Sequence, residues 1–176
     1  MKKLIVIVMI GLSILIYSKI DTEELLIPDE AIRFRVIANS NSVDDQNTKI
    51  LVKNKIEKEI ATDLKNSTNI NTSRKILSRN TDKYSLLVEN TLRENNISQE
   101  YKVNYGLNYF PEKTYKGITY KAGNYESLVV TLGEGKRDNW WCVLFPPLCL
   151  LEGEETNTNQ VEYKSYVKEL IDKYFK

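Results

Sequence analysis

The chain has 176 residues, a nearly balanced charge and no histidine. Lys and Arg number 25 and Asp and Glu number 24, so no basic excess predicts a nucleic-acid partner. The lack of histidine excludes Ser-His-Asp and Cys-His catalysis and removes the commonest metal ligand. The length and composition therefore predict one small domain, and we expect no cofactor and no metal.

The first 20 residues are typical of an export signal. Lys2 and Lys3 precede an apolar run over residues 4–17. As a helix this run would span about 21 Å, short of the roughly 30 Å hydrocarbon core of a membrane. It predicts a signal peptide, although no Ala-x-Ala cleavage site follows, so an uncleaved membrane anchor is the alternative. Either way we expect the remainder to work outside the cytoplasm, after an acidic linker over residues 21–30.

A strand and a long helix are expected next. Apolar side chains alternate over residues 32–38, which predicts a strand. Ser42 followed by Asp45 resembles a capping box, and apolar residues recur every four positions from Val52 to Leu64. These patterns predict a helix over residues 43–64.

The second half of the chain contains segments with the helical period of apolar residues and segments with the strand period. We expect a helix over 73–95 with a possible break at 80–82, strands over 101–109 and 127–132, and a possible short strand within 117–120. Gly133 and Gly135 then indicate a hairpin-type connection. A polar loop over 152–160 precedes an amphipathic C-terminal helix over 161–176. The order β-α-α-β-β-α predicts a single small α/β or α+β domain over residues 31–151.

Both tryptophans and both cysteines fall between Trp140 and Cys149. Fully extended, this segment would hold Cys142 and Cys149 more than about 20 Å apart, whereas disulfide-bonded Cα atoms lie about 4.4 to 6.8 Å apart. A disulfide thus requires a turn, for which residues 145–147 (Phe-Pro-Pro) are suited, and Phe145–Pro146 is a candidate cis bond. Expected export favours the disulfide over two buried free thiols.

The two adjacent tryptophans pose a packing problem. In an extended segment Trp140 and Trp141 would point to opposite faces, so both cannot easily enter one core. Either two layers of structure enclose the segment, or one tryptophan is exposed. An exposed aromatic beside a constrained loop is typical of a binding hot spot.

These motifs resemble the stage II sporulation protein R family. The resemblance rests on residues 32–42 with Asp45 and Gln46, on Gly123-Asn-Tyr125, on Gly133-Glu-Gly135, and above all on residues 139–149. The chain departs from the family pattern at Asn41, where the family usually has Asp. It also departs at residues 136–138 and 150–152.

The resemblance implies a signalling protein and not an enzyme. Such a protein is exported from the forespore into the space between the forespore and mother-cell membranes. There it would activate a membrane-embedded aspartic protease that removes the pro-sequence of the sporulation factor sigma-E. The resemblance assigns the contact with this protease to eight residues: Trp140, Trp141, Phe145, Pro146, Pro147, Arg33, Asn39 and Ser40. Packing in the core is the alternative role for each.

Two functions from other classes remain open. One is an exported hydrolase that uses carboxylates such as Asp44, Asp45 or Glu134. The other is a structural envelope protein.

Overall fold

The computed structural model describes residues 27–115, 118–148 and 160–175. The expected export segment therefore lies outside the described residues. The elements in chain order are β1 (Ile32–Ile37), α2 (Val43–Leu64), α3 (Ile70–Arg79), α4 (Thr81–Glu94), β2 (Tyr101–Phe110), β3 (Lys113–Tyr115), β4 (Ile118–Tyr120), β5 (Gly123–Leu132), β6 (Asn139–Phe145) and α6 (Gln160–Phe175).

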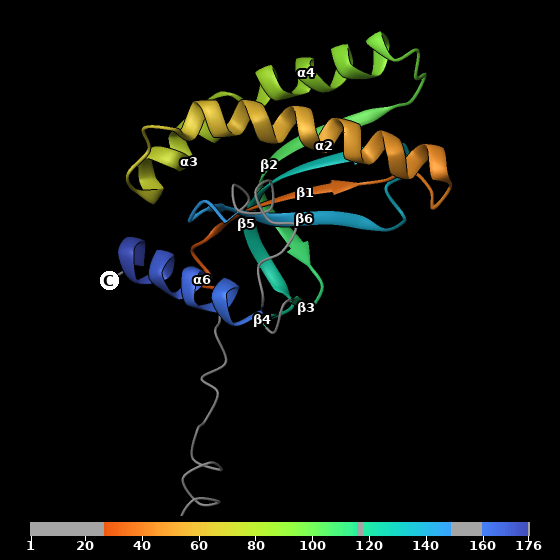
Figure 1. Ribbon diagram of the computed structural model, residues 1–176. Coiled ribbons are helices and arrows are strands. Elements are labelled where there is room, and N and C mark those ends of the chain that lie inside the picture. The colour runs from red at the N-terminus through yellow and green to blue at the C-terminus, as the bar shows by residue number, and fades with distance from the viewer. Residues whose placement is uncertain (1–26, 116–117, 149–159, 176) are drawn as a thin grey trace, which may run out of the picture.

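A four-stranded sheet in the order β2-β5-β1-β6 forms the centre of the fold. β1 runs parallel to β5, whereas the pairs β1–β6 and β2–β5 are antiparallel. Figure 1 shows α2, α3 and α4 on one side of this sheet, and the β3–β4 hairpin and α6 on the other. The predicted class, a single small mixed α and β domain, is confirmed. The possible short strand within 117–120 is present as β4, and β3 and β6 are added to the predicted order.

The helix layer packs on the alternating side chains of β1. Phe34 and Val36 of β1 are fully buried in one cluster with Val52 and Ile56 of α2. The predicted helix start is also present, because the Ser42 side chain accepts a hydrogen bond from the backbone N–H of Asp45 at 3.2 Å. Removing apolar surface from water is the main force that holds α2 to the sheet.

Three boundaries differ from the sequence expectation. The expected break within 80–82 is confirmed at Asn80, between α3 and α4, but α3 begins earlier than expected because Asn69 caps it. β5 begins at Gly123, where it pairs with Phe110 of β2. The expected hairpin-type connection after β5 is wrong, because β1 lies between β5 and β6 in the sheet. The loop over residues 133–138 instead crosses the end of β1.

A second, smaller core lies on the opposite face of the sheet. Ile118 of the hairpin, Val143 of β6 and Val167 of α6 are buried together there. Phe145 links α6 to the end of β6, with its ring centroid 4.8 Å from that of Tyr174. Within the described ranges, no helix has the length and apolar character needed to span a bilayer.

Candidate partner-binding face

Trp140 and Trp141 point to opposite faces of β6, as expected for an extended strand. Trp140 lies on the helix side, where it is partly buried and meets Phe34 edge-on with ring centroids 5.7 Å apart. The Lys53 ammonium of α2 lies 4.4 Å from the centroid of the Trp140 ring, and Lys53 is also ion-paired with Glu57. Trp140 therefore fixes the edge of the sheet to α2 and keeps part of its surface in solvent.

Trp141 occupies the other face of the same strand. Its ring centroid lies 4.7 Å from that of Tyr120 and 5.7 Å from that of Phe110, both in edge-on geometry. The Lys113 ammonium lies 5.7 Å from the Trp141 ring. Both tryptophans are partly buried, so two layers enclose β6 and neither side chain is fully exposed.

Arg33 is a buried cation among aromatic rings. It is 1% exposed, and its guanidinium carbon lies 3.2 Å from the Tyr125 ring centroid and 5.8 Å from that of Trp141. Its Nε and Nη1 have no hydrogen-bond partner among the described residues. Burial lowers the pKa of Arg33, and the opposing influence of Tyr125 only partly offsets it. The rings thus replace water around this charge through cation–π contacts.

The Phe-Pro-Pro turn lies under α6. Phe145 and Pro146 are buried and joined by a cis bond, which confirms that expectation, and Pro147 is partly buried. Cys142 is buried in β6, whereas Cys149 lies outside the described residues, so their disulfide stays a prediction. Of the eight predicted contact residues, Arg33, Phe145 and Pro146 are buried, and they support this face by packing beneath it.

Asn39 connects the end of β1 to the loop after β5. Its Oδ1 accepts a hydrogen bond from the Glu134 N–H at 3.1 Å, and its Nδ2 donates to the Asp45 carboxylate at 3.2 Å. Gly133 has a φ of +55°, and a Cβ at this position would collide with the Asn39 side chain. The glycine in the motif is therefore required both by the backbone conformation and by the close approach of Asn39.

Ser40 shapes the turn that leads from β1 into α2. Its Oγ accepts a hydrogen bond from the Ser42 N–H at 3.0 Å, and its carbonyl accepts one from Gln46 Nε2 at 2.8 Å. Asn41 Oδ1 accepts a hydrogen bond from the Asp138 N–H at 3.1 Å. A carboxylate oxygen would accept the same bond, so the departure from Asp to Asn at position 41 keeps the acceptor.

The sequence reasoning missed that these residues form one network. Gln99, two residues before β2, donates to Asp45 at 3.1 Å, although the two residues are far apart in the chain. No local pattern predicts this network, because it depends on the parallel pairing of β1 and β5, which brings the carboxyl ends of both strands to the same edge of the sheet. Asn39 and Ser40 thus belong to this network at the end of β1. Trp140 and Trp141 lie on the neighbouring strand β6, opposite Val36 and Arg35.

Two of the three carboxylates considered for catalysis, Asp45 and Glu134, do not have the electrostatics of a general acid. A hydrogen bond from Ser40, with further bonds from Asn39, Ser42 and Gln99, lowers the pKa of Asp45 against the opposing effect of burial. The pKa of Glu134 is lowered by Lys136, and Asp44 is exposed. A carboxylic acid that donates a proton near neutral pH needs a raised pKa. In the described part of the chain, no cluster of three or more Cys, Asp or Glu residues could hold a metal ion.

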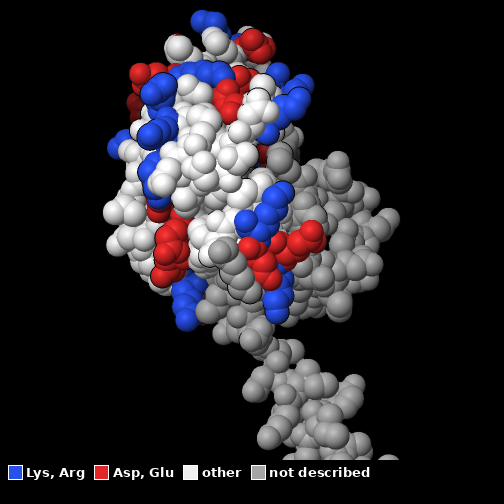
Figure 2. Space-filling view, turned by 90° about the vertical axis from the view of Figure 1, so that its left-hand side faces the viewer, with Lys and Arg blue, Asp and Glu red and all other residues white. Residues whose placement is uncertain are grey.

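The surface charge is mixed on the side that Figure 2 presents, which is the left-hand side of Figure 1. Basic and acidic side chains form small separate groups around an uncharged area, and neither sign dominates. This side therefore carries no continuous field of one sign.

The fold and these motifs define a class: a small α/β protein whose tryptophan-bearing edge strand joins two cores, without an evident catalytic set in its described residues. The family model for Stage II sporulation protein R matches residues 28–155. The Stage II sporulation protein R of Bacillus subtilis (strain 168) is 38% identical over 135 residues, which is 77% of this chain and 60% of that protein. No solved structure matches the chain. The chain belongs to the Stage II sporulation protein R family.

Proposed function

We propose that this chain is an exported sporulation signal that activates the membrane-embedded aspartic protease responsible for processing pro-sigma-E. The observation that carries the proposal is the family match, which spans β1 to β6 and includes the tryptophan-bearing strand. The chain spans about 60% of the length of the curated relative, so the activity of the whole protein is part of this proposal.

Among the described carboxylates whose pKa is shifted, none is suited to act as a general acid. The resolved pKa shifts of Asp45, Asp63, Glu126 and Glu134 are all downward, so these groups are anions at neutral pH. A ligand activates a receptor by binding its active state more tightly than its inactive state. The hydrolase alternative gains no support, because Asp45 is held in a hydrogen-bonded network and Glu134 pairs with Lys136 at 2.9 Å.

The receptor contact in this proposal is centred on β6. Trp140, Trp141 and Pro147 are partly exposed, and the rigid packing around each ring keeps it in one orientation. Large aromatic side chains held in place lose little conformational entropy on binding, which is why they dominate interface energetics. Asn39 and Ser40 would contribute by fixing the adjacent loops. Export into the space between the two membranes places this face opposite the protease.

Pro-sigma-E processing in sporulating cells tests the proposal. An immunoblot would compare wild-type cells, cells that lack the gene, and deleted cells that carry it again at another locus. We expect the unprocessed precursor to accumulate only in the deletion strain. Normal processing in the deletion strain would overturn the signalling function.

A further inference from the structure

β2 closes one edge of the sheet with a long and weakly charged strand. It pairs with β5 and lies at the end of the strand order, so its outer side has no strand partner among the described residues. Its ten residues include a single charge, Lys102, while Leu107 is 76% exposed and Tyr109 is 62% exposed. Apolar edge strands with unpaired N–H and C=O groups promote pairing with another strand.

The residues at equal distances before and after Tyr105 in β2 are similar in polarity on each face of the strand. The side chains on its helix-facing side are all apolar or aromatic, and those on its other side are small, polar or basic up to Asn108. Residues directly opposite each other in an antiparallel pair point to the same face. Two copies paired about Tyr105 would set Tyr101 opposite Tyr109 and Val103 opposite Leu107. Lys102 would face Asn108, so no like charges would meet.

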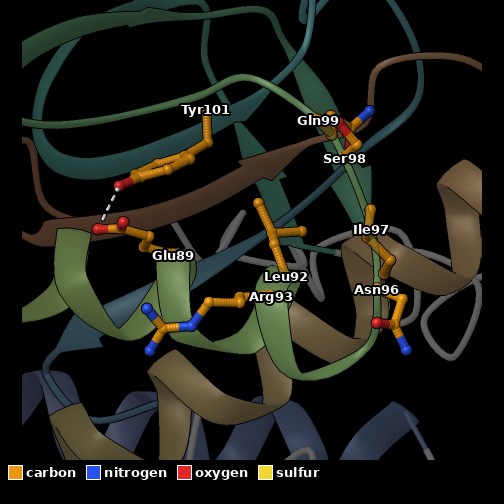
Figure 3. Close-up of a pocket in the computed structure, with 8 residues that line it drawn as sticks. All are labelled: Glu89, Leu92, Arg93, Asn96, Ile97, Ser98, Gln99 and Tyr101. Carbon is orange, nitrogen blue, oxygen red and sulfur yellow. Dashed lines mark hydrogen bonds between the residues drawn. The ribbon is translucent and has the colours of Figure 1, made fainter.

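A pocket lies where this pairing would place the exposed Tyr109 of a second copy. The pocket has a volume of about 500 Å³ and opens between the end of α4 and the start of β2. Leu92, Ile97 and Tyr101 supply its apolar surface, as Figure 3 shows, and Tyr101 is hydrogen-bonded to Glu89 at 3.4 Å along one side. Gln99 also lines the pocket, and its Oε1 has no hydrogen-bond partner within the described ranges.

We propose that two copies of this chain pair through β2, antiparallel about Tyr105, so that their sheets join into one. The partner strand satisfies the outward backbone groups of β2 that have no partner, while the Tyr109 carbonyl already accepts a hydrogen bond from Arg35. It also covers Leu107. Tyr109 of each copy lies against Tyr101 of the other and fills the pocket beside it. The occupant is a second copy because the antiparallel register sets apolar side chains opposite apolar ones and brings no like charges together, as a two-fold symmetric interface requires. This pairing is independent of the signalling proposal.

Disulfide cross-linking between two differently tagged full-length chains tests the register. One chain carries Val103→Cys and the other carries Leu107→Cys, and the unmodified chain gives the background from Cys142 and Cys149. Opposite residues have Cβ atoms about 4.5 to 5.5 Å apart, close enough to cross-link after small adjustments. The Val103→Cys positions of two copies would lie about 13 Å apart along the strands. We expect the mixed pair to cross-link well above the background, and the Val103→Cys pair to stay at background. Equal cross-linking of both pairs would overturn the register.

Co-purification of the two tagged chains tests the interface itself. Leu107→Lys adds a charge at an exposed position, so the monomer should fold, which circular dichroism would verify. We expect co-purification of the unmodified chains and at least a tenfold loss with Leu107→Lys. Val43→Lys, at a position on α2 that is 74% exposed, is the control and should retain co-purification. Absent co-purification of the unmodified chains, or retention by Leu107→Lys, would overturn the proposal.

Discussion

Trp140 and Trp141 are adjacent in sequence but belong to different cores. Trp140 contacts Phe34 beneath α2, whereas Trp141 contacts Tyr120 of the β3–β4 hairpin. An edge-on aromatic pair contributes about 0.5–1.5 kcal/mol beyond the burial of area. Each tryptophan therefore has a structural role, and a test of its binding role must preserve these ring contacts.

Phenylalanine substitutions separate the two roles. Trp140→Phe and Trp141→Phe keep an aromatic ring at each site but remove part of its exposed surface. We expect at least one of them to reduce receptor affinity roughly thirtyfold, about 2 kcal/mol, and so to impair pro-sigma-E processing. The midpoint of urea denaturation should change little. Leu86→Ala, on α4 at a position that is 59% exposed, is the control. Normal processing by both variants, or losses that parallel unfolding, would place the partner face elsewhere.

The close contact between Asn39 and Gly133 leads to a second prediction about a single residue. Gly133→Ala forces a residue with a Cβ into φ +55° and into collision with the Asn39 side chain. We expect a loss of about 2–4 kcal/mol in the free energy of unfolding from strain and from the broken hydrogen bond to Glu134.

A double-mutant cycle isolates this contact. Asn39→Ala alone removes the acceptor for the Glu134 N–H and the donor to Asp45. Alanine at position 39 removes the two closest contacts, with Oδ1 and Cγ, and leaves only the Cβ near the added methyl group. The double variant should therefore be more stable than the sum of the single losses predicts. Urea denaturation measures all four proteins, and strictly additive losses would show that the two residues act separately.

A helix or strand can be predicted from the sequence where a local pattern of residues marks it. The period of α2 and the cap at Ser42 predict its span, and alternation predicts β1 and β2. The strand character of β6 is less visible because its side chains are apolar on both faces, in keeping with two enclosing cores. The span of β5 depends on its long-range pairing with β2, so a local pattern that starts at Ser127 is too short.

Asp63 ties α2 to α4 through hydrogen bonds from two side chains of α4 and from Asn80, the residue before α4. Tyr84 Oη donates at 2.8 Å, Asn80 Nδ2 at 3.0 Å and Lys83 Nζ at 2.7 Å. Burial alone would raise the pKa of Asp63, but these bonds outweigh it, and the pKa lies below its ordinary value of 3.8. The carboxylate therefore stabilises the fold fully above the ordinary pKa, and this contribution is lost as the pH falls through the lower folded value.

Asp63→Asn should remove this pH-dependent contribution. We expect the variant to lose about 2 kcal/mol at pH 7, and the difference from the unmodified chain to shrink steadily below about pH 4. Urea denaturation at a series of pH values measures the difference, with Asp82→Asn in α4 as the control. A difference that stays constant down to about pH 2 would contradict the role of the ionised carboxylate.

At the scale of the whole molecule, the sequence predicts the class of fold better than the arrangement of the site. The loop after β5 reads as a hairpin connection because Gly133 and Gly135 favour tight turns, yet it crosses β1 to reach β6. Strand order depends on contacts between distant residues, which no local pattern contains. For the same reason the sequence selects Asn39 and Ser40 but does not reveal the hydrogen bond between Asp45 and Gln99.

The burial of Arg33 also depends on the assembled fold. Alternation in β1 predicts that Arg33 points away from α2, and on an uncovered sheet this position would suit a solvated cation. The second layer covers that face, with Trp141 and Tyr125 around the guanidinium. Arg33, which the resemblance assigns to the partner contact, is buried and supports the β6 edge, in keeping with the alternative role of core packing.

The most direct test of the central claim is reconstitution in a bacterial host that does not sporulate. The host would express pro-sigma-E and the membrane aspartic protease, with or without this chain fused to an export signal, and an immunoblot would measure processing. We predict processing only when all three proteins are present and this chain is exported. Processing in the absence of this chain, or no processing when all three are present in their proper locations, would contradict its role as the activating signal.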